Sequence, residues 1–235
     1  MIRLVRAQEG HGRNRLLCVA FHVSPTSLRV HLRNSGLEHA YGVSAVTPAG
    51  GYGNPPSMDF ILQQSADSGW PGGPVALIGF AAGCAGLREL LRAGARPDVV
   101  VAVDGIHGPR GQIPASPATL APWREYASLA LSGEVLFVIT HTFQTYTESL
   151  AEKERFPATV NTVRAITGWP LVERAPSPVQ TSSGNLFVLS YDSQSMDRAA
   201  HAEQLSQALP HVLSKYVRPW AGKPDFGVRQ EGMVV

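Results

Sequence analysis

The chain has 235 residues, of which 44% are hydrophobic and 16% are charged, and its formal net charge is +2. A chain of this length can bury a full core, and we expect a single domain that spans residues 1–235. The weak net charge argues against nucleic acids and anionic membranes as partners. The longest apolar runs have the length of a strand, far below the ~20 residues of a membrane span.

The first fifteen residues contain no continuous apolar run of the kind that a secretory signal peptide needs. We therefore expect a cytoplasmic protein, although secretion stays open if the sequence is that of a mature chain from which a signal peptide was removed. Two cysteines, Cys18 and Cys84, are too few for a disulfide framework, and their apolar neighbours predict buried free thiols. The eight histidines are scattered, without an HExxH or CxxC pattern, so the sequence implies no metal site and no cofactor.

Short apolar runs rich in Val, Leu and Ile recur along the chain, separated by patterns that are typical of helices. The runs scarcely alternate between apolar and polar residues, as in strands that are covered on both faces. They fall at 16–22, 41–46, 75–78, 99–103, 135–140 and 186–190, with a further edge strand expected at 2–7. The helical patterns fall at 57–64, 82–93, 122–131 and 201–216, with two more inside 145–167.

This alternation predicts an α/β fold, with a doubly wound, mostly parallel sheet of about six or seven strands and helices on both faces. Two Pro-rich stretches, 105–122 and 169–184, interrupt the pattern and are expected to form ordered loops or short lids. Ligand sites in such folds form where parallel strands end. Each stretch is therefore either part of a site or a simple connection.

Residues 79–83 read Gly-Phe-Ala-Ala-Gly and lie between the predicted strand 75–78 and the helical pattern that follows. Strand, Gly-x-nucleophile-x-Gly, helix is the layout of a nucleophile elbow, a sharp turn that lifts one side chain above the sheet. Small residues at Gly79 and Gly83 let the strand and the helix approach closely. The lifted side chain would be Ala81, which has no nucleophilic atom, and Cys84 lies three positions too far along to replace it.

With this motif after the third of six buried-type strands, the chain resembles the α/β-hydrolase superfamily over about residues 14–220. The resemblance implies the α/β-hydrolase fold and a serine hydrolase, either an esterase or an amidase/peptidase, with nucleophile, acid and histidine in that chain order. With Ala81 in place of Ser, this chain would be catalytically dead. We expect an engineered Ser-to-Ala form; the alternative is a natural pseudohydrolase that acts as a binding protein.

Two further interpretations of the motif stay open at this point. In the first, residues 79–83 match the pattern of a nucleophile elbow only by chance. In the other, the chain is a nucleotide-binding protein whose glycines cradle phosphate. The second is weak because the run GFAAGCAG lacks the Lys-Ser/Thr pair of a P-loop and no GxGxxG pattern occurs.

The resemblance places the catalytic histidine after the last strand, where His201 begins a helical pattern. His107 and His141 also follow predicted strand ends and remain alternatives. Alternatively, His201 has no catalytic role and lies on the helix surface, where it pairs with Asp197 one turn earlier.

The acid of the triad usually follows the strand that is here 135–140, but no carboxylate occurs after it before Glu148. Asp104 ends the preceding strand, a position that some members of the superfamily use. Because a carboxylate at the end of a buried strand is costly without a partner, Asp104 is the first candidate. Glu148 and Asp192 are the alternatives, and Asp104 could instead cap the N–H groups of loop 105–108.

The resemblance also implies an oxyanion hole of two backbone N–H groups. Ala82 would provide one of them, at a helix N-terminus whose dipole favours negative charge. The loop after strand 16–22 would provide the other, with Val23 as the candidate and its neighbours His22 and Ser24 close behind.

Further substrate contacts are expected near the strand ends, from His22, His107, Phe143 and Trp123. The polar stretch 142–147 suits a hydrogen-bonding acyl substrate, either a small molecule or a peptide- or glycan-like chain. The sequence separates neither ester from amide nor one oligomeric state from another.

Overall fold

The computed structural model describes residues 2–11, 15–47, 51–142, 151–171, 178–191 and 198–222. In this part of the chain the strands form one eight-stranded sheet in the order β1-β3-β2-β4-β5-β6-β8-β7. The six inner strands run parallel, whereas β1 pairs antiparallel with β3 and β7 pairs antiparallel with β8. The predicted α/β fold with a mostly parallel sheet is confirmed. The strands are β1 (Arg3–Gln8), β2 (Leu17–Phe21), β3 (Tyr41–Val46), β4 (Val75–Phe80), β5 (Val99–Val103), β6 (Leu136–Thr142), β7 (Val179–Ser183) and β8 (Leu186–Tyr191).

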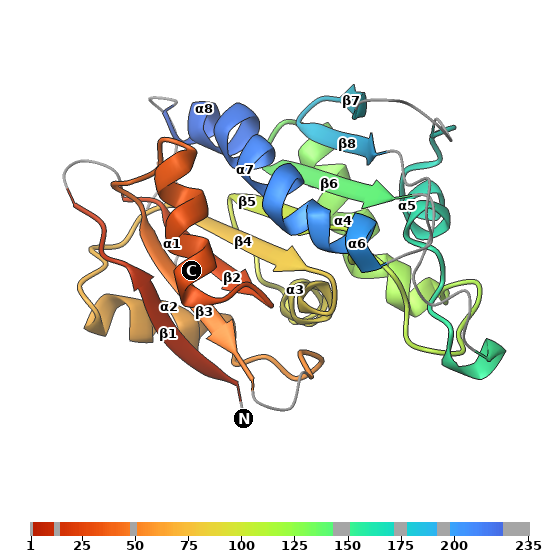
Figure 1. Ribbon diagram of the computed structural model, residues 1–235, viewed down its shortest axis with the longest axis horizontal. Coiled ribbons are helices and arrows are strands. Elements are labelled where there is room, and N and C mark those ends of the chain that lie inside the picture. The colour runs from red at the N-terminus through yellow and green to blue at the C-terminus, as the bar shows by residue number, and fades with distance from the viewer. Residues whose placement is uncertain are drawn as a thin grey trace, which may run out of the picture.

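Helices cover both faces of this sheet, as Figure 1 shows. One face carries α1 (Pro25–Asn34) and the C-terminal helical segment, which comprises α6 (Arg198–Glu203), the π-helical turns η2 (Gln204–Ala208) and η3 (Leu213–Val217), α7 (Leu209–Val212) and α8 (Arg218–Ala221). The other carries α2 (Met58–Asp67), α3 (Gly83–Arg92), α4 (Pro117–Leu131) and α5 (Thr159–Thr167), and a short 3-10 turn, η1 (Glu152–Glu154), precedes α5.

The core is divided by the sheet into two apolar layers. The side chains of Leu77, Val100 and Phe137 point to the layer under α2–α5. Those of Ile78 and Val101 point to the layer under α1 and the C-terminal segment. Strands that are buried on both faces explain the uninterrupted apolar runs of the sequence. None of the helices in the described ranges is long and apolar enough to span a membrane.

Two details of the predicted architecture were wrong. The sheet has eight strands because β7 lies inside the stretch 169–184, which we expected to be irregular throughout. Helix α4 begins at Pro117 and not at Pro122, since the Ser116 side chain accepts a hydrogen bond from the Thr119 N–H and caps the first turn. Pro122 lies inside the helix, and the loop after β5 is correspondingly shorter than predicted.

His141 is fully buried, one residue before the end of β6. Its Nε2 lies 2.9 Å from the Ser190 hydroxyl on β8, and its Nδ1 lies 3.3 Å from the Thr142 carbonyl oxygen. Burial lowers the pKa of His141 to about 4. This imidazole is therefore a neutral part of the sheet, and its position does not support the alternative in which it acts as the catalytic base.

Acid should destabilise the fold through this histidine. An imidazole with a pKa of about 4 in the native state and 6.5 when unfolded binds more protons in the unfolded chain between these values, so stability falls as pH is lowered through that range. The full difference corresponds to roughly 3 kcal/mol. NMR titration of His141 together with denaturant unfolding at several pH values tests this, and a native titration near pH 6.5 would contradict it.

Candidate active site

The predicted elbow is a sharp turn between β4 and α3. Ala81 has a φ of +48°, a left-handed conformation that costs an alanine of order 1–2 kcal/mol. The turn is held from both sides, because the Ala81 N–H donates to the Val103 carbonyl on β5 and its own carbonyl accepts from the Cys84 N–H, each at 3.0 Å. The strained bend is thus present although the side chain it carries is a methyl group.

Two glycines allow the chain to pack this closely around position 81. A Cβ on Gly83 would lie 2.2 Å from the Phe21 carbonyl oxygen, so any larger residue would push α3 away from the end of β2. A Cβ on Gly105 would lie 2.2 Å from the Ala81 carbonyl oxygen. The ends of β2, β4 and β5 are therefore brought together at one edge of the sheet.

Asp104 follows β5 at this edge and is 3% exposed, with a φ of +42°. Its carboxylate accepts hydrogen bonds from Thr142 at the end of β6: the N–H donates to Oδ1 at 3.0 Å, and the hydroxyl lies 3.1 Å from Oδ2. The same Oδ2 lies 2.9 Å from Nδ1 of His201. Because buried carboxylates need such partners, these contacts account for a charge at the end of a buried strand.

His201 reaches this carboxylate from α6, nearly a hundred residues further along the chain. Its ring also stacks on Phe80, the residue directly before Ala81, with the ring centroids 4.9 Å apart. Figure 1 shows α6 at the edge where the arrows of β4 and β6 end. The fold thus gathers position 81, Asp104 and His201 at one edge. Donation from Nδ1 to the carboxylate leaves Nε2 as the acceptor nitrogen of the imidazole.

A row of aromatic rings continues from His201 along this edge. Phe80 lies between His201 and His22, whose ring centroid is 5.6 Å from that of Phe80, and Tyr52 follows at 5.4 Å from His22. Nδ1 of His22 lies 3.1 Å from the Phe80 carbonyl oxygen. Partial burial lowers the pKa of His22, as does the nearby His201. His22 thus lies beside the elbow, and its contact with a substrate stays a prediction.

The remaining candidates fall into different places. Val23 is buried two residues after the end of β2, and Ala82 precedes the first residue of α3. His107 lies close to the Asp104 carboxylate and packs on Phe156; burial lowers its pKa. Trp123, by contrast, is 1% exposed and stacks on Phe137 in the core below the sheet, so its position does not support a substrate contact.

Several expectations fall on residues outside the described ranges: the substrate contact Phe143 and the rest of the polar stretch after residue 142, the alternative acids Glu148 and Asp192, and Asp197 as the alternative partner of His201. Cys84 is described and is buried, with its Sγ 3.3 Å from the Gly79 carbonyl oxygen. Burial raises the pKa of this thiol and so disfavours the reactive thiolate.

Sequence reasoning considered Thr142 only as part of a polar stretch that suits a substrate, and it missed the contact of this residue with Asp104 as well as the rings of Tyr52 and Phe80. No motif marks Thr142; its only signal is its place at the end of a strand next to that of Asp104. Among the described residues, no group of three or more His, Cys, Asp or Glu side chains is arranged to hold a metal ion. A cavity of about 680 Å³ lies at the opposite, amino edge, beside Trp70 and Asp98, and so is separate from this site.

No family model matches the chain, and no curated protein matches it significantly. Among solved structures, the TT1662 protein of Thermus thermophilus superimposes with a TM-score of 0.50 at 17% identity, over 95% of this chain and 99% of that one. A protein from Burkholderia cenocepacia proposed to be an aryl esterase gives 0.49 at 13% identity, covering 93% and 94%. YbtT, the type II thioesterase of the yersiniabactin pathway, gives 0.42 at 15%, covering 94% and 99%.

At these identities the likeness concerns the fold alone. The mostly parallel sheet with its antiparallel edge strands, the elbow after β4 and the superposition over nearly the whole chain agree with one another. The chain has the α/β-hydrolase fold.

Proposed function

We propose that this chain is the nucleophile-less form of a serine hydrolase that cleaves acyl ester or amide bonds, with Ala81 in the position of the serine. The observation that carries the proposal is the 2.9 Å contact between His201 Nδ1 and the buried Asp104 carboxylate beside the elbow. An imidazole oriented by a buried carboxylate, next to a strained turn that presents one side chain, is the arrangement of a catalytic triad.

With serine at position 81, the chemistry follows from these positions. The hydroxyl attacks the acyl carbonyl while His201 Nε2 accepts its proton, and Asp104 holds the imidazole in the required tautomer and stabilises its cation. The backbone N–H groups of Ala82 and Val23 are the proposed donors to the oxyanion. His201 then returns the proton to the leaving group, and a water molecule, deprotonated by the same nitrogen, hydrolyses the acyl-enzyme.

The chain with Ala81 cannot form the acyl-enzyme, because position 81 carries no hydroxyl. It should therefore bind an acyl ligand without turning it over covalently. The same alanine favours a second candidate function, a natural binding protein that kept the fold and lost the nucleophile. The two differ in whether the rest of the site works once a hydroxyl is supplied.

Substitution of Ala81→Ser should create an active hydrolase. Loss of the nucleophile from a triad removes on the order of 10⁶-fold in kcat, and the reverse change should restore a gain of that order if the other groups are positioned as proposed. The measurement is hydrolysis of a panel of short acyl esters and amides, together with covalent labelling by a fluorophosphonate.

Ala81→Gly serves as the matched control, since it relieves the positive φ without adding a hydroxyl and should remain unlabelled. A serine variant that is folded, yet neither labelled nor active, would contradict the hydrolase proposal. If such a variant still bound an acyl ligand, the binding-protein alternative would be the better description.

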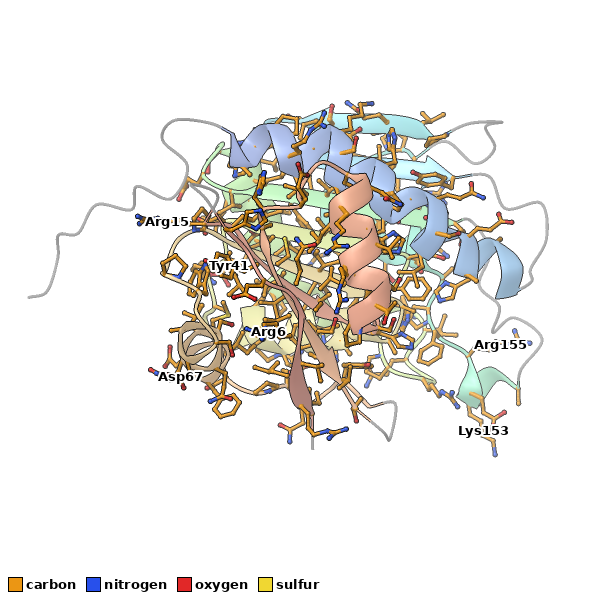
Figure 2. The ribbon with its side chains drawn as sticks, turned by 60° about the vertical axis from the view of Figure 1, so that its left-hand side comes forward. Arg6, Arg15, Tyr41, Asp67, Lys153 and Arg155 are labelled. Carbon is orange, nitrogen blue, oxygen red and sulfur yellow. The ribbon has the colours of Figure 1, made fainter. Side chains whose placement is uncertain are left out.

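In the Ala81→Ser background, His201→Gln should lower kcat by about 10⁶-fold and Asp104→Asn by about 10⁴-fold, because the base is lost in the first case and its tautomer in the second. The controls are His211→Gln and Asp67→Asn, on exposed positions of α7 and α2. Figure 2 labels Asp67, the last residue of α2. Equal activity of the site variants and the controls would show that another pair does the chemistry.

Thr142→Val in the same background should lower kcat by about 10–100-fold with little change in KM, because the hydroxyl that it removes is hydrogen-bonded to the Asp104 carboxylate. Thr142→Ser keeps the hydroxyl and should retain most of the activity. Steady-state kinetics with a pH profile tests this, and a change confined to KM would rule out the positioning role.

A further inference from the structure

Two histidines far from the candidate active site face each other at the opposite edge of the sheet. His11 follows β1 and His39 precedes β3, and these strands pair antiparallel, so the two residues meet where β1 ends and β3 begins. Figure 2 marks this amino edge by Arg15, shortly before β2, and Tyr41, the first residue of β3. The candidate active site lies at the carboxyl edge.

The two imidazoles approach through one nitrogen each. Nε2 of His11 lies 2.8 Å from Nδ1 of His39, and both side chains are exposed. The ring planes are almost perpendicular, at 88°, and the centroids are only 4.3 Å apart. At this distance one of the two nitrogens donates a hydrogen bond to the other, and a metal ion that binds both nitrogens would displace that proton.

The backbone around both histidines is held in place. The His11 N–H donates to the His39 carbonyl at 3.2 Å. Gly10 lies against the Tyr41 ring, where a Cβ would be 2.3 Å from a ring carbon, so a residue with a side chain would push this segment away. The buried amide of Gln8 donates to the carbonyls of Leu37 and Ala40, on both sides of His39. The backbone that carries the two histidines is thus positioned by the fold.

We propose that His11 and His39 form a two-histidine binding site for a divalent transition metal, with Cu²⁺ and Ni²⁺ preferred over Zn²⁺. With metal–nitrogen bonds of about 2.0 Å, neighbouring corners of a square site lie about 2.8–2.9 Å apart, whereas tetrahedral corners lie about 3.3–3.4 Å apart. The observed 2.8 Å matches the square arrangement that Cu²⁺ and Ni²⁺ adopt with N and O ligands. Water would complete the coordination.

Glu38 supports the tautomer that this site needs. Both facing nitrogens must be unprotonated to coordinate, so that His11 carries its proton on Nδ1 and His39 carries its proton on Nε2. The Glu38 carboxylate lies 3.8 Å from His39 Nε2, on the far side of the ring. A carboxylate next to the outer N–H of a ligating histidine favours that tautomer and raises the basicity of the ligand.

Titration of the full chain with NiCl₂ or CuCl₂ in a non-coordinating buffer, followed by calorimetry, tests the proposal. We expect one ion per chain, at least tenfold weaker binding in both His11→Ala and His39→Ala, and weaker binding of Zn²⁺. His211→Ala, which removes an exposed histidine elsewhere, is the matched control and should bind as the parent does. Parent-like binding in both site variants, or a preference for Zn²⁺, would overturn the assignment.

A second measurement avoids reliance on variants that fail to fold. Substoichiometric Cu²⁺ should broaden the imidazole NMR signals of His11 and His39 before those of other histidines. Saturating Ni²⁺ should also raise the Tm of the parent, because an ion that binds only the folded chain stabilises it. Broadening that begins at other histidines would contradict the site.

Discussion

The buried carboxylate of Asp104 is the group on which the arrangement of the candidate site depends. At the end of a parallel strand it is almost completely removed from solvent, and among the described residues its charge is compensated by side chains and backbone from other elements. Thr142 brings the end of β6 to it, and His201 brings the C-terminal helical segment. One desolvated group thereby ties together three segments that are distant in sequence, and it orients the imidazole in doing so.

Much of this could be predicted from local sequence. The inner strands are apolar on both faces, so their existence and parallel pairing followed from composition and spacing. The elbow was recognisable because only small residues permit the approach of α3 to β2, and Gly83 shows that limit directly. The pairing of Asp104 with His201 was predictable because a charge at a buried strand end requires a partner and the fold restricts which histidine can reach it.

Other features depended on tertiary contacts that no local pattern records. Strand β7 is polar and half exposed, so its sequence carries no burial signal, and it is ordered by pairing with β8. Pro122 suggested the start of a helix, but α4 begins earlier, at Pro117, where the Ser116 side chain caps its first turn. Trp123 lay near a predicted strand end, but the helix that carries it turns the ring into the core. Thr142 became important only because β5 and β6 are neighbours.

The non-glycine residues of the described chain with positive φ are His22, Ala81 and Asp104, which directly follow β2, β4 and β5. Within the described residues, backbone strain of this kind is therefore concentrated along one rim of the sheet, at the ends of β2, β4 and β5. Replacement of these residues by glycine would relieve the strain, yet it would also remove the side chains or stiffness that shape the rim. Substitutions meant to raise the Tm of this protein should be made outside this rim, because changes that relieve its strain would also alter the geometry of the candidate site.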